Sequence, residues 1–263
     1  MRRITRLPFG MLFVAAFVIA TSIAFASDAQ AAHRWAKYHW ARTSNPLALQ
    51  LGDNVGTAWD ANLAQASGDW SVSTVLDTSV VAGSTTGSTC AAKQGTVQVC
   101  SSNYGANGWL GLAQIWITRG SHIAQGLAKM NDHYWTPEAN YAYANEAEQQ
   151  HVMCQEIGHT FGLGHTSEDG SSQNTCMDYY HNTSDSDLTS TKPNAHDYDQ
   201  LRSIYKHLDR FNTSAGGASA AAAEWVSGHA PDGTPFGASP ARGHWYVQDL
   251  GNGRLLFTHV FWK

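Results

Sequence analysis

Residues 145–165, which read NEAEQQHVMCQEIGHTFGLGH, constrain the fold more than any other part of the chain. Asn145 with Glu148 three residues later is the pattern of a capping box, which marks the beginning of a helix. A helix-compatible stretch then continues without interruption to Gly162, a residue that commonly ends helices. The sequence therefore predicts a helix from about Asn145 to just before Gly162.

The polar residues in the second half of this helix are spaced for a metal site. Gln155 and His159 are four residues apart and so lie on one helical face, with Glu156 beside them. The glycines that follow let the chain reverse, so that His165 can approach the same point. Two helical side chains and one from the turn can then converge on a single ion.

The pattern resembles a known zinc motif, H-E-x-x-H-x-x-G-x-x-H, with glutamine in place of the first histidine. Downstream, the segment TCMDYY places Met177 where metzincin peptidases carry their Met-turn. On residues 155–179 the chain resembles a zinc metalloendopeptidase of the metzincin clan, similar to matrixins and astacins.

The resemblance implies one catalytic Zn²⁺ ion held by Gln155, His159 and His165. It implies that Glu156 is the general base for a water activated by the metal, and that Tyr179 reaches the metal or the developing oxyanion. His151 is an alternative third ligand, but it lies eight residues, about 12 Å along a helix, before His159. His181 and His196 are either outer groups of the site or surface residues.

Gln155 leaves two functions open, because an amide is not among the usual zinc ligands. In the first, the protein is a secreted zinc endopeptidase that hydrolyses proteins or peptides. In the second, it is a catalytically impaired or inactive homologue that binds peptides or proteins in the same cleft. Retention of the Glu156 carboxylate favours the enzyme.

The resemblance and the order of elements predict an α+β fold of zincin type. We expect a twisted, mostly parallel five-stranded sheet, two long helices and a Met-turn subdomain, with residues 122–132 as the edge strand that takes up peptide. A second helix should begin at the cap Asn194 and bury a stripe on one face. The stripe consists of Tyr198, Leu201, Ile204, Tyr205 and Leu208.

The expected domain organisation has four parts. Residues 1–32 resemble a secretory signal peptide, cut after Ala31 or Ala32, or after Ala26. Residues 33–211 form the catalytic domain, 212–224 an Ala/Gly/Ser-rich linker, and 225–263 a small extension with a β-hairpin at Gly251-Asn252-Gly253. Because a lone hairpin is only marginally stable, it should dock on the main domain.

The four cysteines suit an exported, extracellular protein, in which an even number favours disulfides. Three pairings are formally open. We expect Cys90 with Cys100 and Cys154 with Cys176, a free buried Cys154 being the alternative.

Charge excludes some partners. The whole chain carries a net charge of −5, and loss of Arg2, Arg3, Arg6 and Asp28 with the leader leaves 13 basic and 20 acidic residues, a net −7. We therefore expect no nucleic-acid partner, no membrane contact after leader cleavage, and a monomer. The acidic run at 184–187 suggests calcium only weakly, since a solvated loop has the same composition.

Overall fold

The computed structural model describes residues 33–118, 120–215 and 244–263, and shows a mixed α/β chain built on one sheet. The strand order is β3-β2-β4-β6-β5-β8-β7, with β1 paired to β6. The strands are β1 (His39–Trp40), β2 (Leu47–Asn54), β3 (Leu76–Ala82), β4 (Thr96–Ser102), β5 (Trp109–Thr118), β6 (His122–Asn131), β7 (Trp245–Gly251) and β8 (Arg254–Trp262). Pairs among β1, β2, β3, β4 and β6 are parallel, whereas β5–β6, β5–β8 and β7–β8 are antiparallel. The sheet thus has eight strands and mixed direction, against the expectation of five mostly parallel strands.

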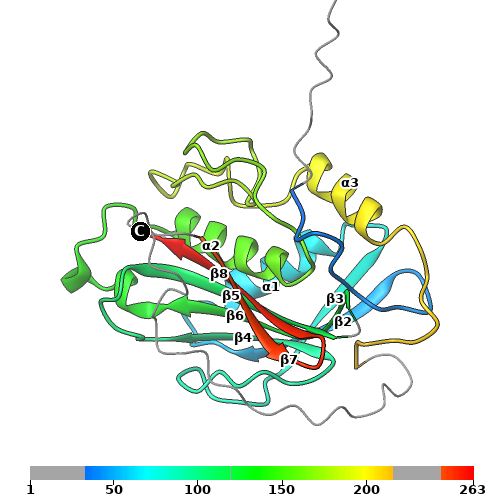
Figure 1. Cartoon of the computed structure of the whole chain (residues 1–263). Coiled ribbons are helices and arrows are strands. Elements are labelled where there is room, and N and C mark those ends of the chain that lie inside the picture. The colour runs from blue at the N-terminus through cyan, green and yellow to red at the C-terminus, as the bar shows by residue number, and fades with distance from the viewer. Residues whose placement is uncertain (1–32, 119, 216–243) are drawn as a thin grey trace, which may run out of the picture. The chain divides into compact units, whose positions relative to one another are not determined.

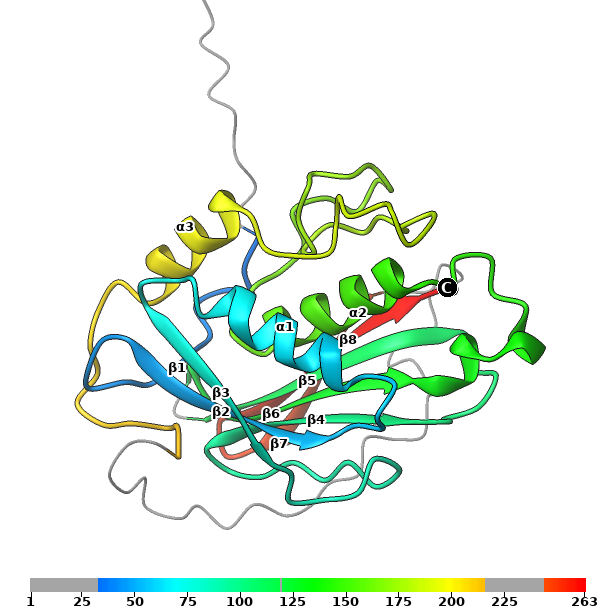
Figure 2. The same ribbon diagram turned by 180° about the vertical axis from the view of Figure 1, so that it is seen from behind.

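Two helices cover one face of this sheet, as both views show (Figure 1, Figure 2). They are α1 (Asp60–Trp70) and α2 (Glu146–His159), whereas α3 (Ala195–Ile204) lies beyond one end of α2. Short 3-10 turns at Asp132–Trp135 and Pro137–Ala139 follow β6. The core between helices and sheet is rich in tryptophan, and the indole Nε1 of Trp70 donates to Cys154 O at 3.1 Å. This bond ties α1 to the middle of α2.

Helix α3 confirms the expected cap and most of the expected stripe. The Asn194 side chain accepts from the backbone of His196 and Asp197, and Asp197 completes a capping box. Leu201, Ile204 and Tyr205 are buried, but Leu208 is 55% exposed because the helix ends at Ile204. Including Leu208 in the stripe was therefore wrong.

The expected edge strand at residues 122–132 is also wrong. β6 lies inside the sheet, hydrogen-bonded to β4 on one side and to β5 on the other. The antiparallel strand β5 would have been the edge, but β8 pairs along nearly its whole length from Trp109↔Trp262 to Ile117↔Leu255. No described residue of β6 offers a free backbone edge to a peptide.

The C-terminal hairpin forms and docks as expected. Gly251, Asn252 and Gly253 all have positive φ, the conformation that a tight hairpin turn requires. Alternate residues of β8 face opposite sides of the sheet, and Phe261 lies in the main hydrophobic core, against which Phe257 also packs. The hairpin thus shares the core of the main unit, which spans Ala32–Lys263.

Parts of the expected domain plan fall on residues outside the described ones: the signal peptide at 1–32, positions 216–224 of the linker, and positions 225–243 of the extension. The start of the linker is described, and it packs on the main domain: Thr213 N donates to Ala41 O at 3.0 Å and Ala215 N to Gly95 O at 2.7 Å. No helix among the described residues has the length and apolar character needed to cross a membrane.

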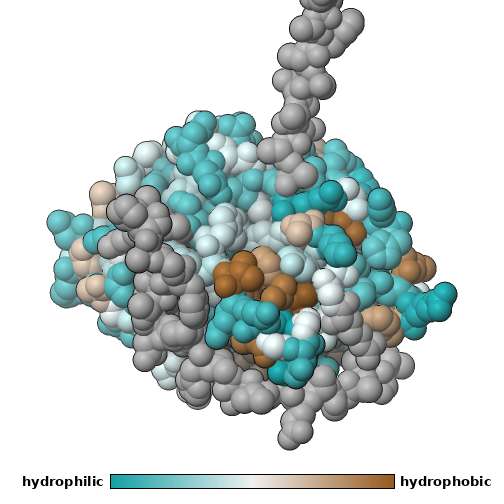
Figure 3. Space-filling model, viewed as in Figure 1, coloured by the Kyte–Doolittle hydropathy of each residue, from teal (hydrophilic) through white to brown (hydrophobic). Residues whose placement is uncertain are grey.

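The molecular surface is mostly hydrophilic on the face shown in Figure 3, with apolar residues gathered near its middle, where Figure 1 draws the hairpin. Val247 of β7 is among the exposed large hydrophobic residues. The two sides of the hairpin therefore differ sharply in burial.

This difference gives a stability test of hairpin docking. Phe261→Ala removes a fully buried ring and should lower the free energy of unfolding by about 3–5 kcal/mol. The matched control Val247→Ala alters a side chain that is 50% exposed and should stay within about 0.5 kcal/mol of the parent. Urea unfolding measures both, and a Phe261→Ala protein as stable as the control would contradict a docked hairpin.

Candidate metal centre

Helix α2 carries the motif residues much as the sequence predicts. The Asn145 side chain accepts from Glu148 N at 3.0 Å, and the helix ends at His159, with Thr160 as its C-cap. Gly162 follows at φ +96°, and a Cβ there would lie 2.3 Å from Tyr38 O. Only glycine fits this turn, which brings the chain back to His165.

Three imidazoles converge at the end of α2. One ligand nitrogen from each of His159, His165 and His259 lies within 4.8 Å of the others. Ring centroids are 4.0 Å apart for His159 and His259, 5.0 Å for His159 and His165, and 4.7 Å for His165 and His259. Nitrogens bound at about 2.0 Å in a tetrahedral zinc site are about 3.4 Å apart, so small side-chain shifts would close this set around an ion.

The Nδ1 atoms of the three rings are each held by an oxygen. His159 Nδ1 donates to Leu163 O at 2.9 Å, His165 Nδ1 lies 3.0 Å from Glu168 Oε1, and His259 Nδ1 lies 3.0 Å from Glu156 Oε2. A carbonyl or carboxylate at Nδ1 fixes the tautomer and leaves Nε2 as a lone-pair donor. All three Nε2 atoms are buried and have no hydrogen-bond partner within the described part of the chain.

Burial also keeps these rings uncharged. It lowers the pKa of His159 and of His259 well below the usual value, and the neighbouring imidazoles act in the same direction. The pKa of His165 is lowered by burial too, with Glu168 opposing the change. Buried, neutral, correctly oriented imidazoles with orphaned nitrogens are a donor set that fits Zn²⁺.

His259 is the residue that our sequence analysis missed. It lies in β8 opposite Ala113 of β5, on the face that also carries Phe257 and Phe261. The alternation of this strand offered a signal, because a histidine between two core-facing phenylalanines is out of place unless it has a partner. Its distance from the motif, about 100 residues along the chain, hid that partner.

Gln155 contacts the Met-turn. Its side-chain Nε2 donates to Asp178 O at 2.6 Å and to Cys176 O at 3.0 Å, and two carbonyl acceptors fix the orientation of the amide. Gln155 Oε1 is buried without a hydrogen-bond partner among the described residues. His151 also faces the turn, with Nε2 3.1 Å from Asp178 O, so it is directed away from the three imidazoles.

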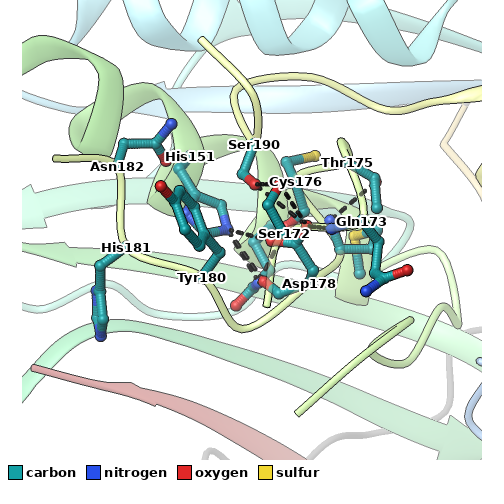
Figure 4. A network of polar contacts seen from close by, with 12 residues as sticks. His151, Ser172, Gln173, Thr175, Cys176, Asp178, Tyr180, His181, Asn182 and Ser190 are labelled. Carbon is teal, nitrogen blue, oxygen red and sulfur yellow. Dashed lines mark hydrogen bonds and ion pairs between the residues drawn. The ribbon is translucent and has the colours of Figure 1, made fainter. Parts of the chain in front are cut away.

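The turn around Met177, expected from the resemblance to be a Met-turn, is held by many polar bonds, several of which Figure 4 shows. Asp178 Oδ2 accepts from Gln173 N at 2.5 Å and from Ser190 Oγ at 3.1 Å. The disulfide Cys154–Cys176 joins the turn to α2, and Cys90–Cys100 closes a loop elsewhere, so both expected pairings are confirmed. Met177 is fully buried.

Glu156 lies beside the imidazoles and is completely buried. Oε2 faces His259 Nδ1, whereas Oε1 has no hydrogen-bond partner in the described structure. Burial raises the pKa of this carboxyl group well above its usual value. β5 passes close by at Gly111, where a Cβ would lie 2.7 Å from Glu156 Cγ.

Aromatic side chains cover the site. The Trp245 ring lies 4.5 Å from the His259 ring and 4.9 Å from that of His165, and its Nε1 donates to Glu168 Oε1 at 3.1 Å. Trp35 stacks on His159 at 5.5 Å. The Tyr179 hydroxyl accepts from Trp262 N at 2.6 Å, so this tyrosine is tied to the end of β8.

A pocket of about 300 Å³ opens beside His165, and Trp35, Glu168, Trp245 and Phe257 contribute to its walls. Of the three imidazole residues only His165 lines it, and the His165 side chain is 1% exposed, whereas His159 and His259 are fully buried. Arg34 also lines it. The pocket walls are therefore mostly apolar, with one positively charged side chain, Arg34, and one carboxylate, Glu168.

The other candidate residues from the sequence lie elsewhere. His181 Nδ1 contacts Glu148 Oε1 at 2.7 Å, and His196 belongs to a second group with His33 and Asp197. In the acidic run at 184–187, Asp185 Oδ1 accepts from Glu146 N at 2.8 Å, and Asp187 Oδ2 accepts from Thr183 N at 2.9 Å. Asp187 thus bonds within the loop, and Asp185 joins the loop to the start of α2.

Comparison of the sequence with models of known protein families and with curated proteins finds no match.

Glu148 gives a pH test of the contact between α2 and the Met-turn. Burial alone would raise the pKa of Glu148, but the His151 ring 3.6 Å away and the hydrogen-bonded His181 outweigh it and lower the pKa to about 2. A carboxyl group with a lowered folded pKa contributes stability above its unfolded pKa, near 4.5, which is lost as pH falls from there toward 2. The difference corresponds to about 3 kcal/mol.

We therefore expect the free energy of unfolding to fall between pH 5 and pH 2.5, measured by urea unfolding, and the fall to be smaller in Glu148→Gln. Glu146→Gln, which changes an exposed carboxylate of the same helical turn, is the control. Equal pH dependence in Glu148→Gln and the parent would contradict the lowered pKa.

Proposed function

We propose that the protein is a zinc-dependent peptidase whose metal is held by His159, His165 and His259. The observation that carries the proposal is the set of three buried Nε2 atoms without partners, each ring fixed through its Nδ1. In this proposal β8 supplies the imidazole that the motif lacks at Gln155, and the Gln155 amide braces the Met-turn.

The site also holds a base. A bound zinc ion would polarise the scissile carbonyl and lower the pKa of water at its open position. Glu156 Oε1, which is free of other bonds in the described structure, takes the proton from the attacking water and passes it to the leaving amine. Glu156 Oε2 meanwhile orients His259 through its Nδ1.

The peptide approaches through the pocket beside His165. Trp35, Trp245 and Phe257 provide apolar walls for a side chain of the substrate, and Arg34 offers a donor to its carbonyl or carboxylate groups. Tyr179 is assigned to anchoring β8, because its hydroxyl bonds to the backbone of Trp262. We place the protein outside the cell, in keeping with its two disulfides and the signal-like leader.

A second candidate is a metal-binding protein without hydrolytic activity. It is favoured by β8, which covers the edge of β5 to which a peptide strand would otherwise add, and by the complete burial of Glu156. In that case Glu156 serves only to orient His259.

Variants of His259 and Gln155 test the metal set, with a variant of His244 as the control. His259→Ala should remove the ion of this site, lowering bound zinc by one per chain in elemental analysis, because two imidazoles and water hold zinc poorly. His244→Ala is the matched control, since this histidine is in the same hairpin segment but outside the converging set. If His259→Ala kept its zinc and Gln155→Ala lost it, the third metal ligand would be Gln155 and not His259.

The base is tested by Glu156→Gln. We expect it to keep zinc and to lower kcat for a denatured protein substrate by at least about 100-fold, as loss of a general base does. A parent protein that binds zinc but cleaves nothing in a peptide library would select the non-catalytic candidate. Undiminished cleavage by Glu156→Gln would show that the assigned base is wrong.

A further inference from the structure

A second cluster of imidazoles lies away from the motif helix, where three segments of the chain meet. His39 belongs to β1, His122 begins β6 beside it, and His207 and Asp209 follow α3. One ligand atom from each of His39, His207 and Asp209 lies within 4.8 Å of the others. His122 Nε2 approaches the same carboxylate, 3.2 Å from Asp209 Oδ1.

The carboxylate at the centre of this cluster is fixed before anything binds. Asp209 N donates to Arg42 O at 2.7 Å, and Arg42 N donates to Asp209 Oδ2 at 3.0 Å. The Arg42 guanidinium is directed elsewhere, to the carbonyl of Tyr205 and the side chain of Asn45. Asp209 therefore faces three imidazoles, with its backbone held in place.

His39 is oriented in the manner of a metal ligand. Its Nδ1 lies 2.7 Å from Lys37 O, so the proton is on Nδ1 and Nε2 offers a lone pair. Only 5% of His39 is exposed, and its Nε2 has no hydrogen-bond partner within the described ranges. Outer partners of this kind fix the tautomer of histidines that bind metals.

A hydrogen bond accounts for His122, whose Nε2 lies 3.2 Å from Asp209 Oδ1, but not for the other two rings. His39 Nε2 is 3.7 Å and His207 Nε2 3.5 Å from the nearest Asp209 oxygen, beyond the usual 2.7–3.2 Å of an N–H···O bond. Ring centroids of His39 and His207 are only 4.8 Å apart, and those of His39 and His122 4.9 Å apart, so protonated rings would repel. A cation among the four side chains would instead attract every lone pair.

We propose that His39, His122, His207 and Asp209 form a second metal site, structural in role and suited to Zn²⁺. With His122 joining the converging group of His39, His207 and Asp209, three imidazoles and one carboxylate would supply four ligands and leave no open position for a substrate, which is the mark of a structural site. His207 is about half exposed and provides the route of entry.

The ion would fasten β1 and the start of β6 to the segment after α3. Both views of the ribbon place that segment beside the turn after β1 (Figure 1, Figure 2). The neighbouring residues reach toward the first centre: Trp40 Nε1 donates to Thr160 O at 2.9 Å, and Tyr205 OH donates to Phe161 O at 2.9 Å. The second site would thus support Trp40 and Tyr205, the two residues whose side chains bond to the backbone at the end of α2.

Zinc stoichiometry of the full chain tests this proposal. We expect His207→Ala and Asp209→Asn each to bind one zinc ion fewer per chain than the parent in equilibrium dialysis followed by elemental analysis. His207→Ala changes a half-exposed side chain, so folding should be preserved. His133→Ala, a histidine outside every converging group, should bind as many ions as the parent.

Affinity and heat stability provide further measurements. Loss of an outer hydrogen-bond partner of a metal ligand weakens metal binding by about 10- to 100-fold. Asp209→Asn changes a ligand itself, so it should weaken zinc binding at this site by more than that. Zinc added to the metal-free parent should raise Tm more than it does in His207→Ala.

The two proposals fail separately. His259→Ala combined with His207→Ala should bind two ions fewer than the parent, whether or not the parent cleaves peptides. Parental stoichiometry and affinity in both His207→Ala and Asp209→Asn would overturn the second site and leave the first untouched.

Discussion

The antiparallel pairing of β8 with β5 is the interaction on which the candidate site depends. It covers what would otherwise be the edge of the sheet, and it carries His259 across to the end of α2. Backbone hydrogen bonds set the register, and the packing of Phe261 in the core and of Phe257 against it enforces that register, because a slip of one residue would turn His259 away from the site.

The Met-turn is the second constraint. One disulfide, the Gln155 amide and the Glu148 carboxylate all join α2 to the segment that follows the third motif position. Glu148 accepts from Asn182 N at 2.7 Å, so the side chain expected to complete the cap at Asn145 is used for this contact instead. Covalent and buried polar bonds together therefore hold this segment to α2.

In the proposed function, the glutamine at position 155 has a physical consequence. The helix would offer one imidazole, His159, to the ion, and the turn would offer one more, His165. A third from a distant strand makes the centre depend on the hairpin, so that hairpin docking, metal binding and any hydrolysis are thermodynamically coupled in the proposed function. In the same way, the proposed metal site at the second histidine cluster would couple metal binding to the docking of the segment after α3.

The sequence by itself determined the local structures: α2 with its cap at Asn145, the glycine turn to His165, the two disulfides, the α3 cap at Asn194 and the hairpin at Gly251-Asn252-Gly253. Each local structure depends on residues that are near one another in the chain. The disulfides depend on four cysteines, which can pair in only three ways. Only the tertiary structure decided that β6 is internal, that Leu208 is exposed and that His259 joins His159 and His165. Strand order and register depend on packing between distant segments, which periodicity within one segment does not specify.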